Sequence, residues 1–142
     1  MLTGECFCGQ VKYQIDGDLN GMYYCHCSMC RKLTGSSFAT NASLDASLFS
    51  ITQGQDLLDT VGHDQHRRYH CAKCHSWVYG DSGDYPGMTF IPCGTLNETP
   101  RQTPTHHVCV DSKAAWVTIR DDLPQYPGMQ PRQALEAEDG GR

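Results

Sequence analysis

The segment Cys25–Lys32, CHCSMCRK, places three cysteines close together, with a histidine between the first two and two cations behind the third. Such spacing is typical of metal sites, and a structural zinc site usually has four ligands. Three thiols leave one position to be filled from elsewhere. The segment also marks a change in the chain, because a strand over Met22–His26 is expected to lead into a short helical turn that Ser28 caps and Gly35 ends.

The nine cysteines of the 142-residue chain fall mainly into clusters. An odd number fits disulfide pairing poorly, and dense thiols in a reducing cytosol indicate metal binding. Two pairs can form a four-thiolate zinc site if the fold brings them together, and this leaves the third cluster to hold a second metal. These groups are Cys6 and Cys8 with Cys71 and Cys74, and then Cys25, Cys27 and Cys30.

Strand alternation predicts how the second cluster is arranged. Alternate residues share one face of a strand, so Cys25 and Cys27 are expected to project together while His26 points the other way. Cys30 follows a tight turn and can return a third sulfur to the same metal. The fourth position is then open to a substrate. The alternative is a closed structural site whose fourth ligand is one of His63, His66, His70, His75, His106 and His107.

Several apolar residues are assigned to the core rather than to a site. Phe7 lies between two chelating cysteines and is expected to point away from the metal into the core. The solitary cysteines occupy apolar strand contexts, where a free thiol behaves as a small hydrophobe. The remaining residues assigned in this way are Cys93, Cys109, Trp77 and Trp116.

Charge and hydropathy exclude several functions. The net charge of −5 argues against general binding of nucleic acid, because no cationic surplus is present to displace phosphate counterions. No apolar run approaches the length of a membrane span. The first residues, MLTGECFCGQ, contain no basic-then-apolar signal segment. These features predict a cytoplasmic protein without a membrane partner.

Short alternating segments separated by Gly, Asp and Asn predict a mainly β fold. Residues 1–126 are expected to form one compact domain of several small antiparallel sheets around a structural zinc. Residues 127–142 are polar and rich in Pro and Gly, which predicts a mobile tail with a transient helical turn over Ala134–Glu138. Besides Met22–His26, the expected strands are Gln10–Ile15, Ser37–Asn41, Leu48–Thr52, Leu57–Val61, Arg67–His70, Ser76–Tyr79, Met88–Pro92, His106–Val110 and Trp116–Ile119.

Together these motifs resemble the glutathione-dependent formaldehyde-activating enzymes, a family that shares a domain with centromere protein V. The resemblance covers about Gly4 to Tyr126. It is carried by Gly4–Gly9 (GECFCG), Val11–Tyr13, CHCSMCRK with Gly35, Arg68–Cys74 (RYHCAKC), Gly94–Leu96 and His107–Trp116 (HVCVDSKAAW).

The resemblance implies a fold like that of a zinc-binding accessory factor of Rab GTPases, and two zinc ions per chain. It places a structural zinc on Cys6, Cys8, Cys71 and Cys74, and a catalytic zinc on Cys25, Cys27 and Cys30. It also implies a carbon–sulfur lyase that joins the thiol of glutathione to formaldehyde, giving S-hydroxymethylglutathione.

Two residues depart from the family pattern. His75 follows Cys74 where the family usually has Gly, and His70 precedes Cys71 where it usually has Phe. Glycine suits that turn because it adopts positive φ freely, and His is one of the more tolerant replacements. Neither departure removes a ligand, but both leave the choice of thiol and aldehyde open.

The expected chemistry has two forms. In the first, a thiol that enters the fourth position is deprotonated because zinc stabilises the thiolate, and this thiolate attacks a carbonyl carbon. In the second, zinc binds the aldehyde oxygen and acts as a Lewis acid. Arg31 and Lys32 are candidates for holding the carboxylates of a thiol such as glutathione, and a solvated turn is the alternative. Two other functions also fit the sequence: a non-catalytic zinc module that binds another protein, and a metal- or thiol-sensing protein.

Overall fold

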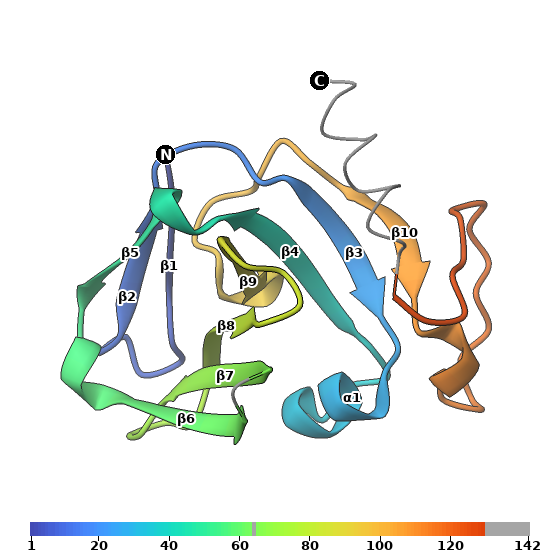
Figure 1. The fold of residues 1–142 in the computed structure, drawn as a ribbon, viewed down its shortest axis with the longest axis horizontal. Coiled ribbons are helices and arrows are strands. Elements are labelled where there is room, and N and C mark those ends of the chain that lie inside the picture. Colours follow the sequence, from blue (N-terminus) through green and yellow to red (C-terminus); the bar gives the residue numbers. More distant parts are fainter. Residues whose placement is uncertain (64, 130–142) are drawn as a thin grey trace.

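Two β-sheets make up the body of the molecule in the computed structural model, which describes residues 1–63 and 65–129 (Figure 1). The small sheet is antiparallel and has the order β1 (Leu2–Glu5), β2 (Lys12–Ile15) and β5 (Phe49–Gln53). The large sheet has the order β10 (Pro104–Val108), β3 (Gly21–Cys25), β4 (Ala39–Asp45), β9 (Met88–Pro92), β8 (Trp77–Ser82), β7 (His66–Cys71) and β6 (Leu58–His63).

The described part of the chain has one α-helix, α1 (Ser28–Thr34), which directly follows β3. Figure 1 shows it beyond the end of β3, on the side away from the N-terminus. Gly35 ends the helix in the left-handed conformation with φ 64°, as the sequence predicts. Short 3-10 turns complete the secondary structure: η1 (Ala46–Leu48), η2 (Gln55–Leu57), η3 (Cys93–Thr95) and η4 (Val110–Ser112).

The larger hydrophobic core lies where the small sheet meets the large one. The alternation of β2 sends Tyr13 and Ile15 inward, and both are almost completely buried. They belong to one cluster with Leu44 of β4, Val78 of β8 and Ile91 of β9. Each fully buried side chain of this size contributes about 1.5–3 kcal/mol, so this cluster is a main source of stability.

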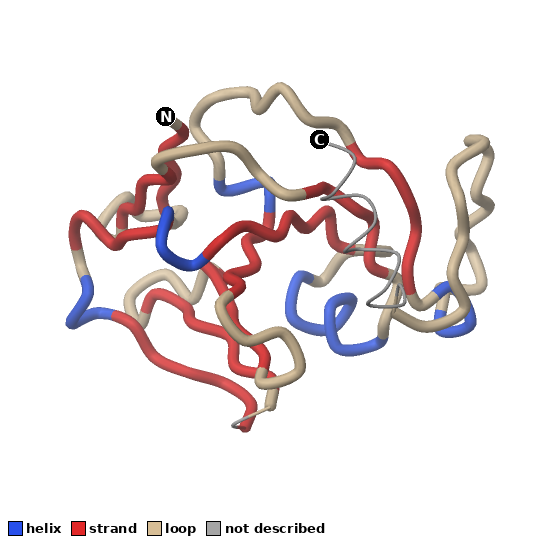
Figure 2. Tube along the Cα trace, turned by 45° about the horizontal axis from the view of Figure 1, so that its top comes forward, coloured by secondary structure: helices blue, strands red, loops and turns tan. Residues whose placement is uncertain are grey.

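The parallel pair in the large sheet positions the second cysteine cluster. β10 runs parallel to β3, and Val108 is the register partner of Cys25. A long loop over residues 113–128 then projects beyond β10 and returns to its outer edge (Figures 1 and 2). The N–H of Tyr126 donates to the carbonyl oxygen of His107 at 2.9 Å, which fixes the returning chain.

The sequence predictions for the strands are largely confirmed, with two errors. β1 was not predicted, and Trp116–Ile119 does not form a strand. Lys113 Nζ donates to the carbonyl oxygens of Ala114 and Val117, so this segment closes into a turn instead of pairing with a strand.

Two aromatic residues assigned to the core lie at the surface. Phe7 points away from the thiols as expected, but that direction leads to solvent, and the residue is 92% exposed. Trp116 is 73% exposed and its indole N–H donates to Ser37 Oγ at 2.8 Å. Trp77 is buried, as predicted.

The mainly β architecture is confirmed. Within the described residues, no helix has the length and apolar character required to cross a bilayer. The division into a domain over 1–126 and a tail over 127–142 remains a prediction. The helical turn expected over Ala134–Glu138 lies outside the described residues.

Candidate metal centres and pocket

The first candidate metal centre joins two turns that are far apart in the sequence. Cys6 and Cys8 lie in the turn after β1, Cys71 ends β7, and Cys74 lies in the turn before β8. Their four sulfur atoms all lie within 4.8 Å of one another. The Cys6–Cys8 and Cys8–Cys71 Sγ distances are 3.6 and 3.8 Å. Sulfurs around a tetrahedral zinc lie about 3.8 Å apart, so this donor set fits that ion.

Backbone N–H groups support these sulfurs. The N–H of Val11 donates to Cys6 Sγ and that of Lys73 to Cys71 Sγ, both at 3.3 Å.

Next to Cys74, His75 has φ 65°, the positive value that the sequence predicts where the family has glycine. The residue therefore keeps the shape of the turn despite the loss of glycine.

The second candidate centre is built at the junction of β3 and α1. Cys25 ends the strand, Cys27 caps the helix, and Cys30 lies in the first helical turn. The three sulfurs lie within 4.8 Å of one another. The helix is capped by Cys27 and not by Ser28 as predicted, because the Cys30 N–H donates to Cys27 Sγ at 3.2 Å. Cys27 Sγ therefore both caps the helix and belongs to the candidate metal centre.

Hydrogen bonding gives the three thiols different pKa values. The thiols of Cys25 and Cys30 donate hydrogen bonds to Cys27 Sγ, and so do the backbone N–H groups of Cys30 and Met29. These bonds hold the pKa of Cys27 far below its ordinary value, although burial opposes the shift. The pKa of Cys25 is raised, first because its thiol hydrogen-bonds to Cys109. Thiolate is the form that binds metal, so the cluster already favours one ligand in the required state.

His26 points away from the thiols, as strand alternation predicts. It is completely buried, and its Nε2 lies 2.8 Å from His107 Nδ1. The Nε2 of His107 in turn lies 3.0 Å from both carboxylate oxygens of Asp121. Among the histidines whose side chains the structure describes, none belongs to either thiol cluster. The side chain of His63 is not among those described.

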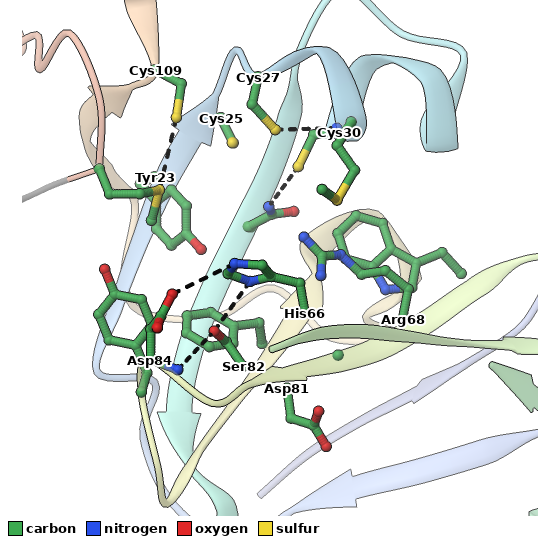
Figure 3. Close-up of a pocket in the computed structure, with 17 residues that line it drawn as sticks. Tyr23, Cys25, Cys27, Cys30, His66, Arg68, Asp81, Ser82, Asp84 and Cys109 are labelled. Atoms are coloured by element: carbon green, nitrogen blue, oxygen red, sulfur yellow. Dashed lines mark hydrogen bonds and ion pairs between the residues drawn. The ribbon is translucent and has the colours of Figure 1, made fainter. Parts of the chain in front are cut away.

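A cavity of about 530 Å³ opens beside the second cluster. Its sulfur-rich end is formed by Cys25, Cys27, Cys30 and Cys109, and Figure 3 shows Arg68, His66 and Asp84 facing this end from β7 and the turn after β8. Aromatic side chains form much of the remaining wall: Tyr23, Trp77, Tyr85 and Phe90.

Two polar side chains on the cavity wall have unused hydrogen-bonding groups. Asn41 is 4% exposed, and its Nδ2 donates to Cys30 Sγ at 3.8 Å. Its buried Oδ1 has no hydrogen-bond partner among the described residues. Arg68 lies over the Trp77 ring at 5.4 Å, and its buried Nε is likewise unpartnered within the described part of the chain. The neighbouring Arg67 differs, because it pairs with Asp81 at 3.0 Å.

The cations that follow the third cysteine do not line this cavity. Arg31 Nη2 donates to the carbonyl oxygen of Ser112 at 3.2 Å, and Lys32 is exposed. The structure instead brings Arg68, Asn41 and Cys109 to the pocket. Sequence reasoning missed that these three residues line the pocket, because each position depends on strand pairing across the large sheet and not on proximity in the chain.

The fold and the two thiol clusters define a small, mainly β protein with two sites suited to metal. The sequence profile of the family described as "Glutathione-dependent formaldehyde-activating enzyme" matches residues 1–112. The chain belongs to this family. It is also similar in fold to a Rhodobacter sphaeroides protein of known crystal structure, with a TM-score of 0.59 and 21% sequence identity over 70% of this chain and 91% of the other.

Proposed function

We propose that this protein is a zinc-dependent carbon–sulfur lyase that joins a small thiol to an aldehyde. Glutathione and formaldehyde are the candidate substrates and S-hydroxymethylglutathione the candidate product, as in the reaction that names the family. The observation that carries the proposal is the position of Cys25, Cys27 and Cys30. They form a three-thiol cluster at one end of a cavity large enough for a small substrate.

The two clusters are proposed to hold zinc for different purposes. Cys6, Cys8, Cys71 and Cys74 supply four thiolates, which is a complete structural set. Cys25, Cys27 and Cys30 supply three, the number of protein ligands that catalytic zinc sites have. Only the second cluster lines the cavity, so only it is placed to meet a substrate.

Zinc at the second cluster would supply either the acidity that ionises a thiol or the Lewis acidity that polarises a carbonyl. The chain's own residues do the positioning. Asn41 donates to Cys30 and holds that sulfur in place, while its free Oδ1 can accept a hydrogen bond from a substrate hydroxyl or amide. The aromatic wall formed by Tyr23 and Trp77 limits the water beside the thiols.

Arg68 is proposed to bind a substrate carboxylate. Its guanidinium lines the cavity, is held over Trp77, and has no acidic partner within the described residues, whereas Arg67 is already paired. Arginine binds carboxylates through paired, charge-assisted hydrogen bonds. This assignment gives Arg68 the role that the sequence predicts for Arg31 and Lys32, and it favours a thiol that carries carboxylates, such as glutathione.

The proposal is tested by turnover with defined metal content. Zinc-loaded protein should accelerate formation of S-hydroxymethylglutathione from glutathione and formaldehyde over the uncatalysed rate, measured by NMR exchange. Cys27→Ser should abolish the acceleration, and Cys93→Ser, which changes a cysteine outside both clusters, should preserve it. Equal rates with and without the wild-type protein, for glutathione and for a panel of other thiols and aldehydes, would reject the enzyme assignment in favour of a binding or sensing role.

A further inference from the structure

A fourth thiol, that of Cys109, lies at the edge of the three-cysteine cluster. Val108 is the register partner of Cys25, and the His26 N–H donates to the carbonyl oxygen of Val108 at 3.1 Å, so the next residue emerges beside the end of β3. The Cys109 thiol lines the same cavity as Cys25, and its S–H donates to Met129 Sδ at 3.8 Å. Hydrogen bonding between the Cys25 and Cys109 thiols is the first cause of the raised pKa of Cys25. Figure 3 shows its sulfur in the same sulfur-rich end as those of Cys25 and Cys27.

The attachment of Cys109 differs from that of the other three cysteines. It is half-buried and precedes the short turn η4, whereas Cys25 ends a central strand and Cys30 lies within α1. Its sulfur is not among those that lie within 4.8 Å of one another, so it is close to the cluster without belonging to its tight core.

The backbone of Cys109 is also unusual. Its φ of 58° and ψ of 38° lie in the left-handed region, which few residues other than glycine adopt. The conformation is held by the Cys109 N–H, which donates to the carbonyl oxygen of Gly128 at 2.8 Å, and by the Ser112 N–H, which donates to the Cys109 carbonyl oxygen at 3.0 Å. The loop thus keeps a cysteine where glycine would fit with less strain.

We propose that Cys109 is a displaceable fourth ligand of the second metal site. In the absence of substrate its thiolate completes the set begun by Cys25, Cys27 and Cys30, and an entering thiol takes its place. This inference rests on the proposed function and adds a step to it. The site is closed at rest and opens for a thiol.

The exchange balances in atoms and charge. With metal bound, the incoming thiol would give up its proton on taking the ligand position, and Cys109 would leave that position and take up the proton. The number of thiolate ligands would stay the same, so no charge would be added to a partly buried site and no external base would be needed. Cys109 then lies in the cavity as a protonated thiol beside the bound substrate.

Cobalt substitution counts the sulfur ligands without reference to activity. Wild type, Cys109→Ser and Cys109→Gly are loaded with two equivalents of Co²⁺ in a phosphine reductant, so that no buffer thiol enters the site. The glycine variant suits the left-handed backbone and guards against misfolding. Cys93→Ser is the matched control. The Cys109 variants should lose about one eighth of the thiolate-to-cobalt charge-transfer absorbance, because one of eight thiolates is missing.

Addition of glutathione completes the test. It should restore the lost absorbance in both Cys109 variants and leave wild type nearly unchanged, because one thiolate replaces another. If wild type and the Cys109 variants instead share the lower absorbance and all gain on addition of glutathione, Cys109 is not a ligand, but the open thiol site of the proposed function stands. If glutathione changes none of the spectra and Cys109→Ser equals wild type, both proposals fail.

Discussion

The sulfur atoms of Cys8 and Cys71 lie 3.8 Å apart although the two residues are 63 positions apart in the chain. Zinc bound there would tie the first strand of the small sheet to the β7–β8 hairpin of the large one, so that its binding energy becomes folding energy. Cys71→Ser should therefore destabilise the whole domain. A loss of about 3 kcal/mol lowers the Tm of a chain of this size by roughly 10 °C.

Calorimetry of zinc-loaded Cys71→Ser measures this effect, with Cys93→Ser as the control for loss of a cysteine outside the clusters. A Tm equal to that of wild type would show that the first cluster is not a structural site.

The two sites should also differ in how firmly they hold metal. The first has four thiolates from turns fixed in the fold, whereas the second has three in its tight core. Graded treatment with a chelator should remove one equivalent of zinc while the circular dichroism spectrum stays native, and the second equivalent only as the fold is lost. Loss of both equivalents in one step would contradict the division into a structural and a catalytic site.

Cys27→Ser should separate activity from folding. The residue holds one metal position and caps a seven-residue helix, but it lies outside the first cluster. We expect at least about a 100-fold loss of turnover, since loss of a residue that only hydrogen-bonds to a metal ligand already costs 10–100-fold. The variant should still unfold cooperatively and keep one equivalent of zinc, which metal analysis and thermal melts can establish. An unfolded Cys27→Ser beside a stable Cys71→Ser would reverse the roles of the clusters.

Arg68→Met should weaken binding of a thiol that carries carboxylates. A charge-assisted hydrogen bond is worth about 1.5–3 kcal/mol, which corresponds to roughly 10–100-fold in affinity for glutathione. Binding of 2-mercaptoethanol, which has no carboxylate, should change little. Arg31→Ala and Lys32→Ala are the matched controls, because both residues lie outside the cavity lining. If these two variants lose glutathione affinity and Arg68→Met does not, the first assignment from the sequence is the right one.

The buried histidine pair should matter for stability and not for metal binding. His107 is 3% exposed and is the partner of His26 Nε2, so His107→Phe leaves a buried ring nitrogen without its hydrogen bond. Such a loss costs about 1–3 kcal/mol of the free energy of unfolding. Denaturant melts measure the cost, and metal analysis should still give two equivalents of zinc. Loss of one equivalent would make a histidine part of the second site.

Local sequence patterns predicted the elements that depend on near neighbours. The alternation of Tyr13 and Ile15 indicated a half-buried strand, and both side chains are in the core. Gly35 was predicted to end the helical turn and His75 to occupy a position that favours positive φ, and their φ values are 64° and 65°. The tight grouping of the thiols followed from spacing and from the family resemblance, since ligands two or three residues apart can reach one metal.

Features that depend on distant pairing could not be read in the same way. Cys109 was assigned to the core because its neighbours are apolar, but the parallel pairing of β10 with β3 brings it to Cys25. Arg68 faces the thiols because β7 lies on the far side of the cavity, while Arg31 turns to Ser112. Trp116 resembles a core aromatic by composition, but its loop projects beyond the sheet.

Turnover during zinc titration of the metal-free protein tests the central claim most directly. The structural site at Cys6, Cys8, Cys71 and Cys74 should fill first, so the first equivalent should restore the native fold with little acceleration of S-hydroxymethylglutathione formation. Activity should then rise through the second equivalent and stop at two. Full activity at one equivalent, or none at any zinc content, would contradict a catalytic metal centre at Cys25, Cys27 and Cys30.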